Sequence, residues 1–191
     1  MNRARLFAVL IGSALLMAGG AFPAAQTLGE KERFTAVAVV NNARTSGAGI
    51  VQIDITRWST AAEREALIGA LKKGSAALLD MLQDTRPVGT IKTPDSLGYD
   101  LHYAHQTALP DGGRRIVIAT DRPIGFWEAA NRPRTIEYPF TVIQMEIGKD
   151  GKGKGTMSYA TRIIPAGNTI VLENFDTQPV MLTEVRAEKH T

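Results

Sequence analysis

The sequence predicts a mainly β fold of the α+β class: an antiparallel β-sandwich or a partly closed β-barrel of about nine strands, with a helical insertion near residues 60–84. The main observation is that apolar and polar residues alternate in many short segments, which is the pattern of strands with one buried face. Closely spaced turn residues separate these segments, and tight turns join antiparallel neighbours. The region of the insertion has helical periodicity instead.

The strand pattern occurs at residues 34–40, 51–56, 88–93, 98–105, 114–119, 140–147, 156–164, 169–174 and 180–185. Between two of these segments, residues 149–155 are rich in glycine and lysine and predict a flexible hairpin tip. They also match part of a phosphate-binding loop. Gly155, however, stands where a hydroxyl residue must follow Lys154, and no helix follows, so the hairpin tip is the better interpretation.

The helical insertion begins with a capping-box pattern, Thr60 followed by Glu63, with Ser59 as an alternative cap. Lysines and a glycine at residues 72–74 are typical of a helix end. A second short helix is predicted for residues 75–83. The residues of the first helix that fall on one face, and that we expect to be buried, are Ala62, Ala66, Leu67, Ala70 and Leu71.

The first residues predict export. Arg3 and Arg5 precede an apolar run of roughly 16 residues, as in a secretory signal, and a membrane span needs about 20. We expect a signal peptide at residues 1–25 and a single β-rich domain at residues 26–191, periplasmic or secreted, with no membrane span after signal removal. An uncleaved N-terminal anchor is the alternative, because the candidate cleavage sites fit poorly.

Charge and composition exclude several classes of function. Without Arg3 and Arg5, 20 basic residues stand against 19 acidic ones, and no long basic stripe is present, so we expect no nucleic-acid binding. The absence of cysteine excludes thiol nucleophiles, redox pairs and cysteine-ligated metals. No pattern in the sequence predicts a cofactor.

A metal site is one interpretation of the histidines, because Asp100, His102 and His105 lie close together in the sequence. On a continuous strand Asp100 and His102 share one face while His105 points to the other, and two residues on one face do not make a ligand set. We therefore predict no metal site and interpret these histidines as ordinary surface or network residues.

A hydrolytic site is another interpretation of the polar residues. Ser96 or Ser158 can combine with His102 and an acid, and Asp121 can pair with Glu128, because such sites are recognised by geometry rather than by sequence order. Nothing in the spacing favours either arrangement. We predict no catalytic residue.

Residues 119–134 contain the densest group of side chains suited to binding. They form a predicted irregular connection between strands, where binding residues often lie, and arginine beside tryptophan can hold an anionic or planar ligand. The predicted ligand-binding residues are Asp121, Arg122, Trp127, Glu128, Asn131 and Arg132. The alternative is structural: Phe126 and Trp127 plug one end of the sheet, and Asp121 pairs with Arg122 or Arg132 to fix the loop.

Several segments share a further likeness: Arg114 to Arg134, Ile55 to Arg64 and Leu172 to Thr183. Together they resemble an uncharacterised family of small exported bacterial proteins. The resemblance implies export, one domain and a bacterial origin. It implies no activity, so it gives no residue a catalytic role.

We therefore expect an exported, non-catalytic β-rich domain that binds an unknown small molecule or another envelope protein. The alternatives are a hydrolase that uses Asp, Glu and His chemistry, and a structural or stress-related envelope component. An open-mouthed barrel with an apolar lining would favour ligand binding, whereas an unbroken polar exterior without a sizeable apolar cleft would favour the structural role.

Overall fold

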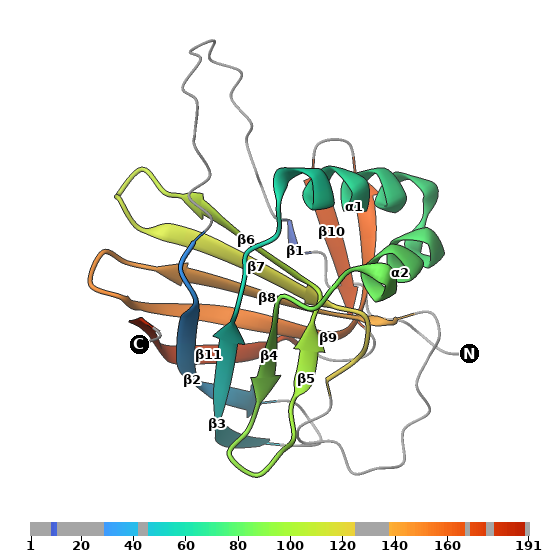
Figure 1. The fold of residues 1–191 in the computed structure, drawn as a ribbon. Coiled ribbons are helices and arrows are strands. Elements are labelled where there is room, and N and C mark those ends of the chain that lie inside the picture. The colour runs from blue at the N-terminus through green and yellow to red at the C-terminus, as the bar shows by residue number, and fades with distance from the viewer. Residues whose placement is uncertain are drawn as a thin grey trace.

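The computed structural model describes residues 9–10, 29–41, 46–124, 138–166, 169–174 and 178–189. Its strands are β1 (Val9–Leu10), β2 (Glu32–Asn41), β3 (Ser46–Ile55), β4 (Gly89–Lys92), β5 (Tyr99–Leu101), β6 (Tyr103–Ala108), β7 (Arg114–Thr120), β8 (Phe140–Ile147), β9 (Lys152–Ala166), β10 (Thr169–Asn174) and β11 (Val180–Lys189). The helices α1 (Ala61–Lys73) and α2 (Ser75–Asp84) lie between β3 and β4 (Figure 1). All strand pairs are antiparallel, so the predicted mainly β fold with a helical insertion is confirmed.

The sheet is a nearly closed barrel whose two ends meet in one stretch of chain. Its strand order is β5-β4-β3-β2-β11-β9-β8-β7-β6, so the first and last strands of this path are consecutive in sequence. Only His102 separates them, and its backbone N–H donates to the carbonyl oxygen of Ala119 in β7. If β5 and β6 are counted as one bent strand, the path makes a barrel of about eight strands, a size at which side chains fill the interior or leave room for one small ligand.

The remaining two strands lie beside this path. β10 pairs with the second half of β9, and β1 pairs with the other edge of β10 (Figure 1). β1 falls within the expected signal peptide, whose other residues lie outside the described part of the chain, so the signal peptide stays a prediction.

The boundaries of some strands differ from those predicted. The single strand expected at residues 98–105 is broken at His102, because Leu101 and His102 are both buried and the alternation of faces stops there. β9 begins at Lys152, so the later half of the expected hairpin tip at residues 149–155 is part of a strand.

The interior of the barrel is filled by apolar side chains. Every strand on the barrel path contributes to one buried cluster. Among its fully buried members are Phe34, Ile53, Ile116, Met145 and Leu182. Burial of apolar surface is the main stabilising contribution to a fold of this kind, and it also leaves the centre of the barrel occupied by protein.

The helices cover the outside of the barrel next to β8, β9 and β10 (Figure 1). Leucines of α1 and α2 pack there against Phe140, Ile163 and Leu172.

The predicted capping box is confirmed: Thr60 Oγ1 accepts the Glu63 N–H, and the Glu63 carboxylate accepts the Thr60 N–H. The predicted buried face of α1 is partly wrong, since its described buried residues are Leu67, Ala70 and Leu71 whereas Ala62 and Ala66 are exposed. None of the described helices has the length and hydropathy needed to span a membrane.

Candidate functional site

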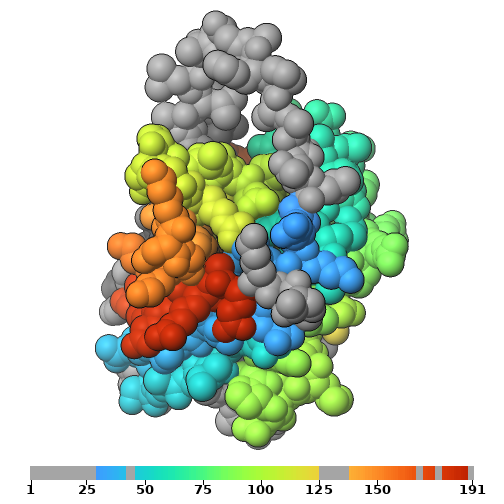
Figure 2. Space-filling model, turned by 60° about the vertical axis from the view of Figure 1, so that its left-hand side comes forward, coloured from blue at the N-terminus to red at the C-terminus, as the bar shows by residue number. Residues whose placement is uncertain are grey.

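One end of the barrel opens into a cleft of about 890 Å³. Here β2, β7 and β9 begin and β6, β8 and β11 end, as an up-and-down strand order requires. Figure 2 shows the start of β2, the β6–β7 hairpin and the end of β11 coming together on one side of the molecule. The lining residues are Glu32, Trp58, Ser59, Thr60, His105, Gln106, Thr107, Ala108, Gly112, Gly113, Arg114, Ile147, Gly148, Lys149, Gly151 and Ala187.

Arg114 is the most highly connected charged residue of the cleft. Its guanidinium donates to both carboxylate oxygens of Glu32, at 2.8 Å for Oε2, and to Gln106 Oε1 at 2.9 Å. The same guanidinium lies over the ring of the buried Phe34, 5.8 Å from its centroid. The ion pair therefore joins the first residue of β2 to the first residue of β7 directly above the packed interior. Bidentate pairing fixes the orientation of the planar guanidinium.

Trp58 and the two residues after it form one wall of the cleft. Ser59 pairs with Ala104 of β6: its N–H donates to the Ala104 carbonyl, and its Oγ accepts the Ala104 N–H at 3.1 Å. Ser59 therefore binds β6 rather than capping α1. The Trp58 indole is buried and donates to the carbonyl of Glu30 at 3.3 Å. The chain before β2 thus passes close to this indole, and a Cβ atom on Gly29 would lie 2.3 Å from its nitrogen.

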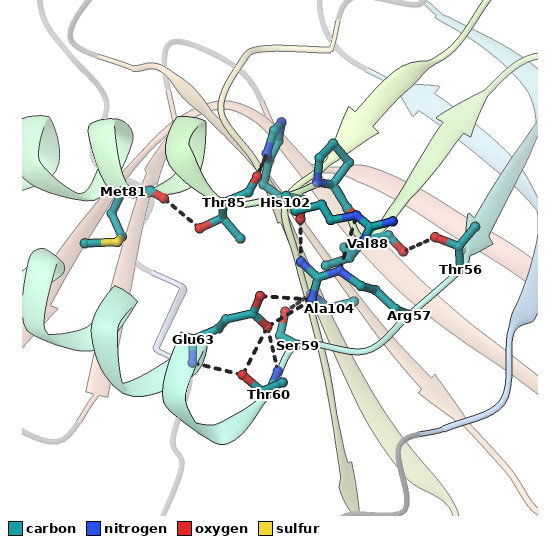
Figure 3. Close-up of polar contacts among 12 residues, drawn as sticks. Thr56, Arg57, Ser59, Thr60, Glu63, Met81, Thr85, Val88, His102 and Ala104 are labelled. Atoms are coloured by element: carbon teal, nitrogen blue, oxygen red, sulfur yellow. Dashed lines mark hydrogen bonds and ion pairs between the residues drawn. The ribbon is translucent and has the colours of Figure 1, made fainter.

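Arg57 fixes this wall by binding both ends of the helical insertion (Figure 3). Its guanidinium donates to the Glu63 carboxylate at 3.0 Å and to the Pro87 carbonyl at 3.3 Å. Burial alone would raise the pKa of Glu63, but hydrogen bonds from Arg57 and Thr60 outweigh it and lower that pKa. The capping box and the wall beside it are therefore held by one ionic network.

The opposite wall consists of backbone from two hairpins. Gly112 (φ 80°) and Gly151 (φ 76°) adopt the left-handed conformation, which glycine adopts without steric penalty. The side chain of Lys149 lies over Gly112, since a Cβ atom there would be 1.9 Å from Lys149 Cε. This wall is therefore low in side chains and carries a lysine at its rim.

His105 borders the cleft from β6. Its ring stacks on Tyr103, with centroids 6.3 Å apart. Burial lowers the pKa of His105, and the positive charge of Arg64 lowers it further. Both effects favour the neutral form of the imidazole.

The predicted ligand-binding residues that the structure describes are Asp121 and Arg122, and neither lines the cleft. Arg122 Nε donates to Asp121 Oδ1 at 3.1 Å. Burial raises the pKa of the Asp121 carboxyl, but Arg122, His102 and Thr120 outweigh burial and lower it. This pairing is the one expected under the structural alternative. The other predicted binding residues, Trp127, Glu128, Asn131 and Arg132, lie outside the described residues, so a binding role for this segment stays a prediction.

His102 connects the end of α2 to the end of β7. Its Nδ1 lies 2.9 Å from the carbonyl oxygen of Thr85 (Figure 3), and its Nε2 lies 3.5 Å from Asp121 Oδ1. Both ring nitrogens thus face hydrogen-bond acceptors, which suits a structural link rather than a free general base.

The geometry corrects the expected arrangement of Asp100 and His102. They do not share a face, since Asp100 is exposed and His102 is buried at the break between β5 and β6. Ser96, a proposed nucleophile, uses its Oγ within its own turn, where it accepts the Thr93 N–H at 2.9 Å. Within the described part of the chain, no group of three or more His, Cys, Asp or Glu side chains is placed to hold a metal ion.

Sequence reasoning missed the cleft residues Glu32, Gln106, Arg114 and Lys149. They are far apart in the sequence and belong to no motif, so only the pairing of the strands brings them together. No family model, no curated protein and no solved structure matches the chain. The resemblance to a family of exported bacterial proteins therefore stays a prediction.

Proposed function

We propose that this chain is an exported, non-catalytic barrel protein that binds a small ligand in the cleft at its Glu32–Arg114 end. The observation that carries the proposal is an open cleft of about 890 Å³ above a filled interior, with a polar cluster fixed at its floor. Sites for small ligands have volumes of roughly 300–1,000 Å³ and combine apolar walls with a few well-placed polar groups.

The rigidity of the polar cluster supports this function further. Glu32, Gln106 and Phe34 together fix the guanidinium of Arg114 in position and orientation. A group that is ordered before binding loses less conformational entropy when a ligand arrives. The cluster also joins β2 to β6 and β7, so its position depends on the packing of several strands rather than on one loop.

The first experiment compares the purified protein with two tryptophan variants by native mass spectrometry. Ala108→Trp fills the cleft, whereas Ala48→Trp places the same side chain on an exposed position of β3 that does not line the cleft. We expect a bound small molecule on the wild-type protein and on Ala48→Trp, and none on Ala108→Trp. Equal occupancy of both variants, or an empty wild-type protein, contradicts the proposal.

Binding of an envelope protein is a second candidate, and an outward-facing apolar strip favours it. Val37 pairs with Ile50 and Val39 pairs with Met181 across β3, β2 and β11. Ile50 is 56% exposed and Met181 is 48% exposed. Contiguous exposed apolar side chains are typical of interaction surfaces.

Cross-linking in envelope extracts tests this second candidate. We expect Ile50→Lys to abolish a specific cross-linked product, while Leu97→Lys, at a fully exposed apolar residue outside the strip, leaves it unchanged. Equal yields for both variants rule out the strip as the interface.

A further inference from the structure

We infer that the ligand of the cleft is a small organic acid with an apolar body, whose carboxylate is bound by Arg114 and Lys149. This inference rests on the proposed function, because it specifies the ligand of the same cleft. It follows from the hydrogen-bond donors that are left over in the cleft, from its charge and from the apolar residues in its walls.

The guanidinium of Arg114 has N–H groups that make no hydrogen bond to the described residues. An arginine carries five N–H donors, and the contacts in the described part of the chain use three of them, two to Glu32 and one to Gln106. The donors left are the Nε–H and one N–H of Nη2. The side chain is 28% exposed, so a ligand in the cleft can reach it. A carboxylate is the group that best matches a planar pair of N–H donors.

The charges that line the cleft do not balance. Arg114 and Lys149 are positive and Glu32 is negative. Arg114 already binds both oxygens of Glu32, which leaves Lys149 with no ion pair among the described residues. The aliphatic chain of Lys149 lies over Gly112, which stands two residues before Arg114 in the sequence. The Lys149 ammonium group therefore lies at the rim of the cleft, next to the beginning of β7, the strand that carries Arg114.

The aspartates of the two hairpins hydrogen-bond to backbone N–H groups of their own turns. Asp111 accepts the Gly113 N–H at 2.9 Å, and Asp150 accepts the Lys152 N–H at 3.1 Å. Neither carboxylate lines the cleft. A ligand with a single negative charge therefore completes the charge balance of the lining, whereas an amine adds to the excess and a neutral molecule leaves it uncompensated.

The rest of the lining favours an apolar body. Trp58, Ala108, Ile147 and Ala187 lie around the polar floor. Removal of apolar ligand surface from water favours binding. A short alkyl or aryl chain attached to the carboxylate gains this contribution, and the charged end determines its orientation.

The test is isothermal titration of the purified protein with octanoate, with 1-octanol and with octylamine. We expect octanoate to bind most tightly and to bind more weakly at high salt. Lys149→Gln removes the unpaired cation and should weaken octanoate binding about fivefold, the effect of losing roughly 1 kcal/mol of a solvent-exposed charge contact. Lys154→Gln is the matched control, because Lys154 is exposed on β9 and does not line the cleft.

Glu32→Gln supplies a second and opposite readout. It removes the negative charge beside the site, while the glutamine amide oxygen can still accept from Arg114, so octanoate should bind several-fold more tightly. The inference is overturned if octanol or octylamine binds as well as octanoate, or if Lys149→Gln and Lys154→Gln have equal effects. It is also overturned if octanoate does not bind. A neutral or basic molecule found in the cleft refutes this inference alone, whereas an empty cleft refutes the proposed function as well.

Discussion

The guanidinium of Arg114 lies over the ring of Phe34, 5.8 Å from its centroid, at the boundary between the barrel interior and the cleft. Phe34 is fully buried, and Arg114 is partly exposed on its cleft side. A charged group can occupy this boundary because Glu32 balances its charge and the aromatic face is electrostatically favourable to a cation. This contact separates the part of the barrel that stabilises the fold from the part to which we assign binding.

The Glu32–Arg114 pair should contribute measurably to stability. Because the pair is bidentate and partly buried, a double-mutant cycle with Glu32→Gln and Arg114→Met should give a coupling energy of about 1–3 kcal/mol in urea unfolding. The pair Arg115–Glu146 on the neighbouring strands is the control. It is more exposed and uses one carboxylate oxygen, so its coupling should stay below about 1 kcal/mol. Equal couplings contradict the structural role of Arg114.

His102 should stabilise the attachment of α2 to the barrel through its contacts with Thr85 and Asp121. His102→Asn retains a donor near Nδ1 and His102→Gln retains one near Nε2. Both variants should lose about 1–3 kcal/mol of unfolding free energy, and the Asn variant should lose less, because the contact to Thr85 is shorter than the contact to Asp121. His105→Asn is the control and should change stability far less. A loss at His105 equal to that at His102 refutes this assignment.

Stability should fall in acid, because the pKa values of Asp54, Glu63 and Asp121 are lowered in the folded protein. Burial raises the pKa of Asp54, but hydrogen bonds from Arg33 and Gln52 outweigh it. In the window below the unfolded-state values of about 4, the unfolded chain binds more protons than the folded one. The stability that these carboxylates contribute is therefore present above that window and is lost as pH falls through the lower folded values.

Asp54→Asn should make this acid transition shallower. The measurement is urea unfolding at pH 7, 5, 4 and 3 for the wild type, for Asp54→Asn and for Asp95→Asn, which changes an exposed turn residue. We expect the stability difference between wild type and Asp54→Asn to shrink as pH falls, while Asp95→Asn follows the wild type. A difference that is constant with pH contradicts the assignment.

The structure also identifies a position, Asn174, at which a substitution should stabilise the protein. Both side-chain polar atoms of Asn174, in β10, are buried and have no hydrogen-bond partner among the residues that the structure describes. Such groups are unfavourable by about 1–3 kcal/mol, so Asn174→Leu should raise the unfolding free energy by roughly 1 kcal/mol or more. Asn41→Leu, at the exposed end of β2, should give no gain. A destabilised Asn174→Leu protein indicates that the amide has a partner role, which contradicts this account of the site.

Local patterns in the sequence predict the fold class well. The alternation of residues 51–56 and the capping box at Thr60 and Glu63 depend on neighbours in the chain, and both features occur where predicted. The break at His102 was not predictable from alternation, because Tyr99, Leu101 and Tyr103 continue the strand pattern through it. The bend is set by barrel closure, since β5 pairs with β4 whereas His102 and β6 pair with β7.

The cleft could not be predicted from the sequence for a related reason. Glu32 and Arg114 stand 82 positions apart, and each is an ordinary charged residue at the start of a strand. Counting the predicted antiparallel strands places the starts of both strands at one end of the barrel, but only the packing of the side chains shows that the two charges meet there. The predicted binding residues of the segment 119–134 are close together in the sequence, whereas those of the cleft become neighbours only in the folded chain.

The most direct test of the central claim is a map of amide chemical shifts in the ¹⁵N-labelled protein during titration with octanoate. If the cleft is the binding site, the largest shifts will occur at Gly112, Gly113, Gly148 and Lys149. Shifts confined to the segment of residues 121–132, or to the outward strip around Ile50, would contradict the account.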